Sequence, residues 1–208
     1  GFGRRSTVLP MPVPGPAQLE RARTAFPDGE FRVLWVGRFS PEKRLELLLD
    51  CAAELPGVKF DVVGRPNRDD DDYTRALYSR ARQLPNVILH GMIPHEDIGE
   101  FYRVAALLCN TSVYEGFPNT FIEAWSYGVP VLAGVDPDGL IGTRGLGLVA
   151  KEREGLIKGI ESFRLDSQMW RGCSNQSRRY FEIHHAMDAG AVRFERVFAE
   201  VAARHPVG

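Results

Sequence analysis

Two glutamates eight residues apart, Glu115 and Glu123, flank the stretch of this sequence with the clearest chemical potential. Between them, Gly116 permits a tight turn, Pro118 favours an extended entry, and Asn119 is predicted to be the N-cap of a short helix. The first N–H groups of a helix have no intrahelical partner, so they can face an anion. Carboxylates beside such a helix start suit a ligand that carries a phosphate and several hydroxyl groups.

A second pair of charged residues, Arg38 and Lys43, follows Gly37 at the end of the apolar run 31–36. The guanidinium can bind a diphosphate as a fork and the ammonium as a point charge. Each pair also has an interpretation without a ligand. The two cations could lie on a solvated surface loop, and the two glutamates could stabilise the dipole of a helix near its start. We favour the ligand-binding interpretation because both groups follow predicted strands.

The elements that must position these residues alternate along the chain. Apolar runs ended by glycine or turn residues predict strands, and periodic apolar residues predict the helices between them. The expected strands are 31–36, 58–63, 86–90, 105–109, 129–134 and a short one at 146–149. The expected helices are 17–25 (weak), 41–55, 73–84, one that follows a turn at 93–95 and runs through 102, one from Asn119, 152–164, 167–183 and 189–203.

This order predicts an α/β fold, a Rossmann-like doubly wound parallel sheet of about six strands with helices on both faces. Ligands of such sheets bind beyond the carboxyl ends of the strands. Four features lie at those predicted ends: Gly37, Gly64, Gly91 and the pair Glu115-Gly116. Observations from separate parts of the sequence therefore indicate one ligand-binding edge.

Composition excludes several other classes of protein. The formal net charge of −1 over 208 residues gives no broad attraction to nucleic acid or to an anionic membrane. No run approaches the roughly 18 apolar residues of a transmembrane segment, and the start lacks the apolar core of a signal peptide. Three distant cysteines without CxxC spacing favour reduced thiols and a cytoplasmic location. A first residue that is glycine rather than methionine favours a fragment of a longer protein.

Metal binding has a weaker basis. Asp136 and Asp138 could share a divalent cation, but Asp-Pro-Asp-Gly is equally good turn chemistry. The acidic run 69–72 is expected to be a solvated loop and helix start. The five histidines show no ligand spacing, and no GxGxxG, GxxxxGK[ST] or GxSxG motif is present.

The motifs resemble those of the group 1 (family 4) retaining glycosyltransferases. Gly37-Arg38 followed by Lys43 is similar to the GR(x)4K element of that family, and Glu115 to Glu123 is similar to its E-x7-E signature. Residues 86–91 resemble its NV-x-x-x-G strand, and the resemblance covers residues 6–150. It implies one half of a GT-B fold, namely the C-terminal domain that binds a nucleotide-sugar donor such as a UDP- or GDP-sugar.

The resemblance also implies roles for individual residues. Arg38 and Lys43 would neutralise the donor diphosphate, Glu115 would face the transferred sugar, and Glu123 would bind the ribose hydroxyls. No metal is expected, because the two cations substitute for it electrostatically. The implied catalytic residues are Arg38, Lys43 and Glu115; the implied donor-binding residues are Gly37, Gly64, Gly91, Met92, Ile93, Gly116, Phe117, Pro118, Asn119, Thr120 and Glu123.

A complete enzyme of this family has a second domain. Residues 1–16 are expected to be a linker from a missing N-terminal acceptor domain, residues 17–187 the donor-binding domain, and residues 188–208 a helix that packs toward the missing part. The parent would move a sugar to a glycan or lipid-linked acceptor, as in cell-surface polysaccharide synthesis, with peripheral membrane association left open, and this fragment alone would be inactive. A non-catalytic sugar-nucleotide-binding module and a GT-B sugar-nucleotide epimerase are the alternatives.

Overall fold

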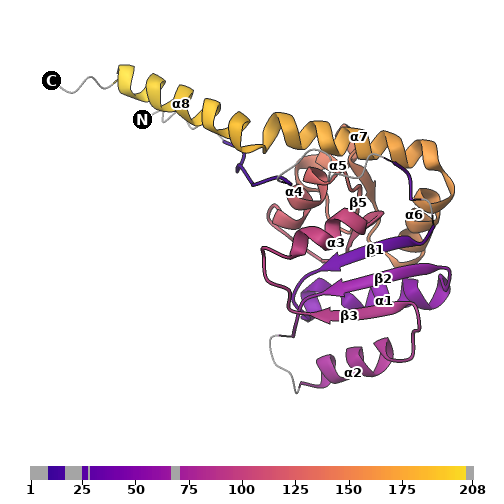
Figure 1. Cartoon of the computed structure of the whole chain (residues 1–208). Coiled ribbons are helices and arrows are strands. Elements are labelled where there is room, and N and C mark those ends of the chain that lie inside the picture. The colour runs from indigo at the N-terminus through magenta and orange to yellow at the C-terminus, as the bar shows by residue number, and fades with distance from the viewer. Residues whose placement is uncertain (1–8, 17–24, 28, 67–70, 205–208) are drawn as a thin grey trace.

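The centre of the structure, a computed structural model that describes residues 9–16, 25–27, 29–66 and 71–204, is a parallel β-sheet (Figure 1). Six strands in the described part of the chain lie in the order β3-β2-β1-β4-β5-β6, and each neighbouring pair is parallel. Their bounds are β1 Phe31–Val36, β2 Val58–Val63, β3 Val87–Gly91, β4 Leu107–Asn110, β5 Val131–Ala133 and β6 Gly147–Val149.

Helices cover both faces of the sheet, as alternate side chains of β1 demonstrate. Val33 and Trp35 belong to a core shared with α1, α2 and α6, whereas Leu34 belongs to a second core shared with α3, α4 and α5. The predicted doubly wound α/β fold is therefore confirmed. The helices are α1 Leu45–Glu54, α2 Asp72–Ala81, α3 Ile98–Val104, α4 Asn119–Ser126, α5 Leu140–Arg144, α6 Arg153–Leu165, α7 Ser167–His184 and α8 Met187–Arg204, with 3-10 turns at η2 Pro41–Lys43 and η3 Pro137–Gly139.

The order in which the chain adds strands changes side at β1: β2 and β3 lie on one side of it, and β4, β5 and β6 lie on the other. β1 and β4 are therefore neighbours in the sheet although about 70 residues separate them in sequence. Val33 pairs with Leu107 and Leu34 with Leu108. The chain leaves β1 toward the face of α1 and leaves β4 toward the opposite face, where α4 lies. Such a switch point opens a crevice at the carboxyl ends of the two strands.

Most predicted elements lie within a few residues of their observed places, but the first helix was predicted incorrectly. We expected it to start at Pro41. Residues Pro41–Lys43 instead form a 3-10 turn, and α1 starts only at Leu45. The break is Arg44, which adopts the left-handed conformation at φ 49° and ψ 46°. A non-glycine residue in this conformation costs on the order of 1 kcal/mol, which the rest of the fold must offset.

Two further helix starts differ from the expectation. The predicted N-cap, Asn119, is the first residue of α4; Pro118 is the N-cap and makes no side-chain capping bond. The helix expected after the turn 93–95 begins only at Ile98, because a turn closed by the Asp97 N–H and the Pro94 carbonyl (3.0 Å) extends farther than predicted. The weak helix expected at 17–25 lies almost wholly outside the described residues.

The two C-terminal helices form a long arm along one side of the sheet, and α8 projects beyond the body of the molecule (Figure 1). The described part of the expected linker, residues 9–16, runs beside the junction of α7 and α8. His185 holds it there, since its Nδ1 lies 2.8 Å from the Met11 carbonyl and its own carbonyl accepts from the Val13 N–H at 2.8 Å. No helix in the described ranges combines the length and the hydropathy that a membrane span requires.

Candidate functional site

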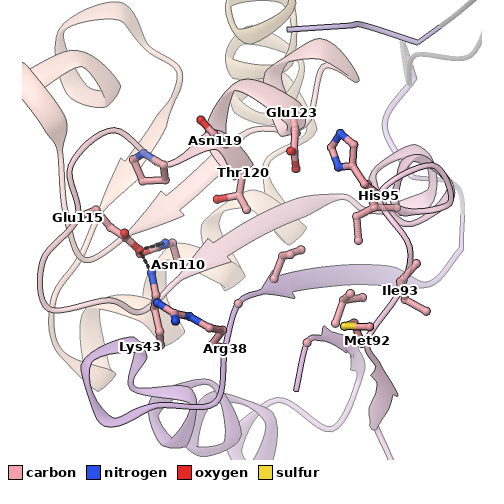
Figure 2. A pocket seen from close by; sticks show the side chains of 16 residues that line it. Arg38, Lys43, Met92, Ile93, His95, Asn110, Glu115, Asn119, Thr120 and Glu123 are labelled. Atoms are coloured by element: carbon pink, nitrogen blue, oxygen red, sulfur yellow. Dashed lines mark hydrogen bonds and ion pairs between the residues drawn. The ribbon is translucent and has the colours of Figure 1, made fainter. Parts of the chain in front are cut away.

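A pocket of about 440 Å³ lies at the carboxyl edge of the sheet, beside the β1–β4 switch point (Figure 2). Its walls come from the ends of β1, β2 and β4 and from the segments that follow β1, β3 and β4. This volume falls within the range of small-molecule sites. The two predicted cations and the two predicted glutamates all line it.

The two cations are positioned by the chain that follows β1. Phe39, beside Arg38, is buried and packs against the ring of Trp35 at 6.0 Å between centroids. The turn that carries Lys43 is fixed by Thr111, whose hydroxyl donates to the Lys43 carbonyl at 2.6 Å and accepts from the Trp35 indole N–H at 3.0 Å. Both bonds join β1 and its turn to the residue that follows β4. The cation loop is therefore attached to the loop that carries Glu115.

Lys43 and Glu115 meet across the switch point. Lys43 Nζ lies 2.5 Å from Glu115 Oε1, and the two side chains are 21% and 16% exposed. The same oxygen accepts from the Ser112 hydroxyl at 2.7 Å and from the Asn110 side-chain amide at 3.4 Å. Figure 2 shows Arg38 beside this pair, with its guanidinium toward Lys43. Three donors thus converge on one carboxylate.

These contacts set the charge of Glu115. Burial alone would raise the pKa of its carboxyl group, but the hydrogen bonds from Lys43 and Ser112, together with the Lys43 charge, lower the pKa below its ordinary value. Glu115 is therefore ionised at neutral pH, and in the free protein its charge is matched by that of Lys43.

Close backbone packing shapes the floor of the pocket where β1, β2 and β3 end. The Gly37 N–H donates to the Val63 carbonyl at 3.0 Å, and the Gly64 N–H donates to the Gly91 carbonyl at 2.8 Å. A Cβ atom on Gly64 would lie 1.7 Å from the Gly37 carbonyl oxygen, and its φ is +145°. Only glycine fits at position 64, so the strand ends can approach each other and leave backbone groups accessible to a ligand.

The opposite wall is the first turn of α4. Asn119 and Thr120 line the pocket there, and Glu123 follows one turn later with its carboxylate directed into the pocket (Figure 2). Glu123 Oε2 accepts a hydrogen bond of 2.7 Å from the hydroxyl of Tyr102, which is fully buried on α3. The wall therefore combines helix N–H groups with one anchored carboxylate.

The structure brings most of the predicted site residues to this pocket. Those that line it are Gly37, Arg38, Lys43, Gly64, Met92, Ile93, Glu115, Pro118, Asn119, Thr120 and Glu123. Three predicted residues are close in sequence but outside the lining, namely Gly91, Gly116 and Phe117. Phe117 is 40% exposed, and its ring lies 6.1 Å from that of Trp125 and 6.0 Å from that of His185.

Five lining residues were not predicted: Val36, Val63, His95, Ile98 and Asn110. Asn110 could have been found, since it directly follows the predicted strand 105–109 at the ligand-binding edge. His95 was assigned only to a helix start, whereas it lies in the turn before α3 and faces the pocket (Figure 2). Helical periodicity carries no signal for the direction in which a side chain of such a turn points.

Other residues considered as ligands lie elsewhere. His90 pairs with the buried Asp61 at 2.8 Å, and Asp61 also accepts two bonds from Arg32 at 2.8 and 2.9 Å. Asp136 accepts from the N–H groups of Ile141 and Gly142 and so caps α5. No cluster of three metal-ligating side chains occurs among the described residues.

Comparison with known proteins agrees with this geometry. The sequence model of the family "Glycosyl transferases group 1" matches residues 17–179. A D-inositol 3-phosphate glycosyltransferase of Mycobacterium tuberculosis is 33% identical over 123 residues, which are 58% of this chain and 26% of that protein. The chain thus spans about a quarter of the length of this curated relative.

Solved structures share the fold. HepE of Anabaena, crystallised in complex with UDP, superimposes with a TM-score of 0.72 at 21% identity, over 83% of this chain and 49% of that one. A sucrose-phosphate synthase of Thermosynechococcus elongatus also gives a TM-score of 0.72, at 26% identity over 86% of this chain and 47% of that one. In both cases the chain corresponds to about half of the larger protein.

Proposed function

The chain belongs to the group 1 glycosyltransferases, and from this premise we propose that it is the part of such an enzyme that binds a nucleoside-diphosphate sugar for transfer with retention. The observation that carries the proposal is the composition of one pocket. Arg38 and Lys43 stand on one wall, and Glu115, Glu123 and the first turn of α4 stand on the other. Cations suit a diphosphate, whereas carboxylates and free N–H groups suit hydroxyls and phosphate oxygens.

The proposed chemistry follows from where charge develops. When the bond between the sugar and the diphosphate breaks, negative charge grows on the departing phosphate oxygen. Arg38 and Lys43 would stabilise that charge, and the N–H groups of Asn119 and Thr120 would add fixed dipoles beside it. With two cations in place, the transfer would need no divalent metal.

The sugar and the nucleoside would occupy the two ends of the pocket. Glu115, anchored by Ser112 and Asn110, would accept hydrogen bonds from the transferred sugar. Glu123 would accept from the ribose hydroxyls, and the segment 91–93 would contact the base. UDP is the first nucleotide to test, because a structural relative was crystallised with UDP.

The acceptor site would belong to another part of the parent protein. Coverage of 49% of HepE and 26% of the inositol-phosphate glycosyltransferase supports a second domain in the parent. The acceptor would be a glycan or a lipid-linked molecule. The 208-residue chain by itself should bind the donor but transfer no sugar.

Isothermal titration calorimetry on this chain tests the proposal. UDP should bind in the presence of EDTA, and Arg38→Ala should weaken that binding about tenfold, as expected for one charge-assisted contact. Arg75→Ala is the matched control, because Arg75 is exposed on α2 and does not line the pocket. Absence of UDP and GDP binding, or equal losses in the two variants, would refute the site. Dependence on a divalent cation would refute metal independence.

A further inference from the structure

We propose that Tyr102 is a positioning residue that fixes Glu123 for recognition of the ribose hydroxyls and so determines selectivity for ribonucleotides. The inference rests on the proposed function, since it takes Glu123 as the ribose-binding group. It extends that function to a residue outside the pocket lining, on a different helix.

The contact joins two helices on one face of the sheet. Tyr102, on α3, is 0% exposed, and its hydroxyl donates to Glu123 Oε2 at 2.7 Å. Its ring is stacked on that of Tyr127 with 5.9 Å between centroids and 21° between planes. The ring is thus immobilised by packing before any ligand arrives, and the hydroxyl has a fixed direction.

The protonation state of Tyr102 makes it a permanent donor. Burial raises the pKa of its hydroxyl well above the ordinary value, and the neighbouring Glu123 carboxylate adds to this increase. A neutral phenol can donate its only proton to Glu123, so that carboxylate is held as an acceptor. An ionised carboxylate offers about four acceptor sites, so one donor leaves capacity for two vicinal hydroxyls.

Fixing Glu123 in advance should increase its contribution to binding. A free glutamate side chain loses rotamer entropy when a ligand immobilises it. With Tyr102 holding one oxygen, much of that entropy is already lost in the free protein. The ribose hydroxyls then meet an oriented acceptor, and a deoxyribose leaves that acceptor unmatched.

A purely structural role makes a different prediction. A buried phenol needs a hydrogen-bond partner, and Glu123 could serve only as that partner. Loss of the Tyr102 hydroxyl would then lower stability and leave selectivity between ribose and deoxyribose unchanged. The chain contains a matched control for this: Tyr73 donates to Glu46 Oε2 at 2.6 Å, and neither residue lines the pocket.

The experiment compares the dissociation constants of UDP, 2′-deoxy-UDP and 3′-deoxy-UDP for the wild-type chain, Tyr102→Phe, Glu123→Ala and Tyr73→Phe. The wild type and Tyr73→Phe should prefer UDP about tenfold over each deoxy analogue. Glu123→Ala should abolish the preference, and Tyr102→Phe should reduce it to about twofold. Phenylalanine keeps the stacked ring, and the melting temperature of each variant reports its folding.

The outcomes distinguish the role of Tyr102 from the ribose-binding role of Glu123. If Glu123→Ala abolishes the preference and Tyr102→Phe keeps it, the role of Tyr102 is refuted while the proposed function stands. Equal weakening of all three nucleotides by Tyr102→Phe refutes the inference in the same way. A preference that survives Glu123→Ala, or no binding of UDP by the wild type, refutes the ribose assignment and the inference together.

If Tyr102→Phe fails to fold, the hydroxyl proton of Tyr102 in the wild-type NMR spectrum provides the test. A larger shift with UDP than with 3′-deoxy-UDP supports the positioning role, and equal shifts contradict it.

Discussion

Replacing Glu115 by glutamine should tighten the binding of UDP, although Glu115 lies in the pocket. In the free chain its carboxylate is paired with Lys43 at 2.5 Å between Nζ and Oε1. A diphosphate that takes Lys43 as a partner must compete with this pair and must also approach a carboxylate of like charge. UDP carries no transferred sugar, so it gains nothing from Glu115 in return.

The expected gain in UDP affinity follows from Coulomb's law. A diphosphate oxygen in contact with Lys43 would lie about 6 Å from the Glu115 carboxylate. In water a diphosphate charge of −2 and a carboxylate charge of −1 at that distance repel each other by ~1.4 kcal/mol. Screening at physiological salt reduces this by about half. Glu115→Gln should therefore lower the dissociation constant of UDP by roughly three- to tenfold.

Titration calorimetry at two salt concentrations tests this reasoning. The gain in affinity should shrink as sodium chloride is raised from about 50 to 500 mM, because salt screens charges. Glu54→Gln is the control, since it changes the net charge equally but lies on α1 in an exposed pair with Arg153. If Glu115→Gln weakens UDP binding, Glu115 orients Lys43 for the diphosphate and does not compete with it.

Three further predictions concern stability. Gly64→Ala should lower the free energy of unfolding, measured with urea, by about 3 kcal/mol or more, because its Cβ would lie 1.7 Å from a carbonyl oxygen. Gly172→Ala on α7 is the control: no atom lies within 4 Å of the added Cβ, so stability should be unchanged or increased. Thr111→Val should lower the free energy of unfolding by on the order of 2 kcal/mol and weaken UDP binding, because it removes both hydrogen bonds that attach the Lys43 turn. An unchanged free energy of unfolding and an unchanged affinity for UDP would contradict this prediction. The wild type should have a larger free energy of unfolding than Glu115→Gln, and this difference should be complete above pH 4.5. It should decline as the pH falls through the lowered folded-state pKa of Glu115, because the unfolded chain then binds the proton more readily than the folded chain. A difference that stays constant with pH would refute the linkage.

The sequence predicted best those features that depend on local chemistry. β1 and β2 were placed at their observed bounds, because each is an apolar run that ends at a glycine. The placement of Arg38 and Lys43 at the same sheet edge as the two glutamates followed from a rule about parallel sheets, and these four residues do line one pocket. Their roles toward a donor stay predictions.

Features that depend on packing at a distance were not predictable. The left-handed Arg44 interrupts a sequence with good helix propensity, and nothing in the local sequence marks residue 44 for this conformation. Tyr102 reads as one more apolar position of a short helix, and its bond to Glu123 requires knowledge of how α3 and α4 pack. The ion pair of Lys43 and Glu115 joins residues 72 apart in sequence and requires the strand order.

The strand order also explains why the free pocket is stable with four charged side chains in it. Because β1 and β4 are neighbours, the cation that follows one strand reaches the carboxylate that follows the other, and their charges cancel across the switch point. An unpaired, partly buried charge would cost several kcal/mol, so this pairing lowers the energy of the empty state. A diphosphate sugar would then bind by exchange: the phosphates take over Lys43, and the sugar hydroxyls take over Glu115. Such an exchange needs both parts of the donor, so the chain should prefer the intact nucleotide sugar to the nucleotide alone, and this preference should disappear in Glu115→Gln.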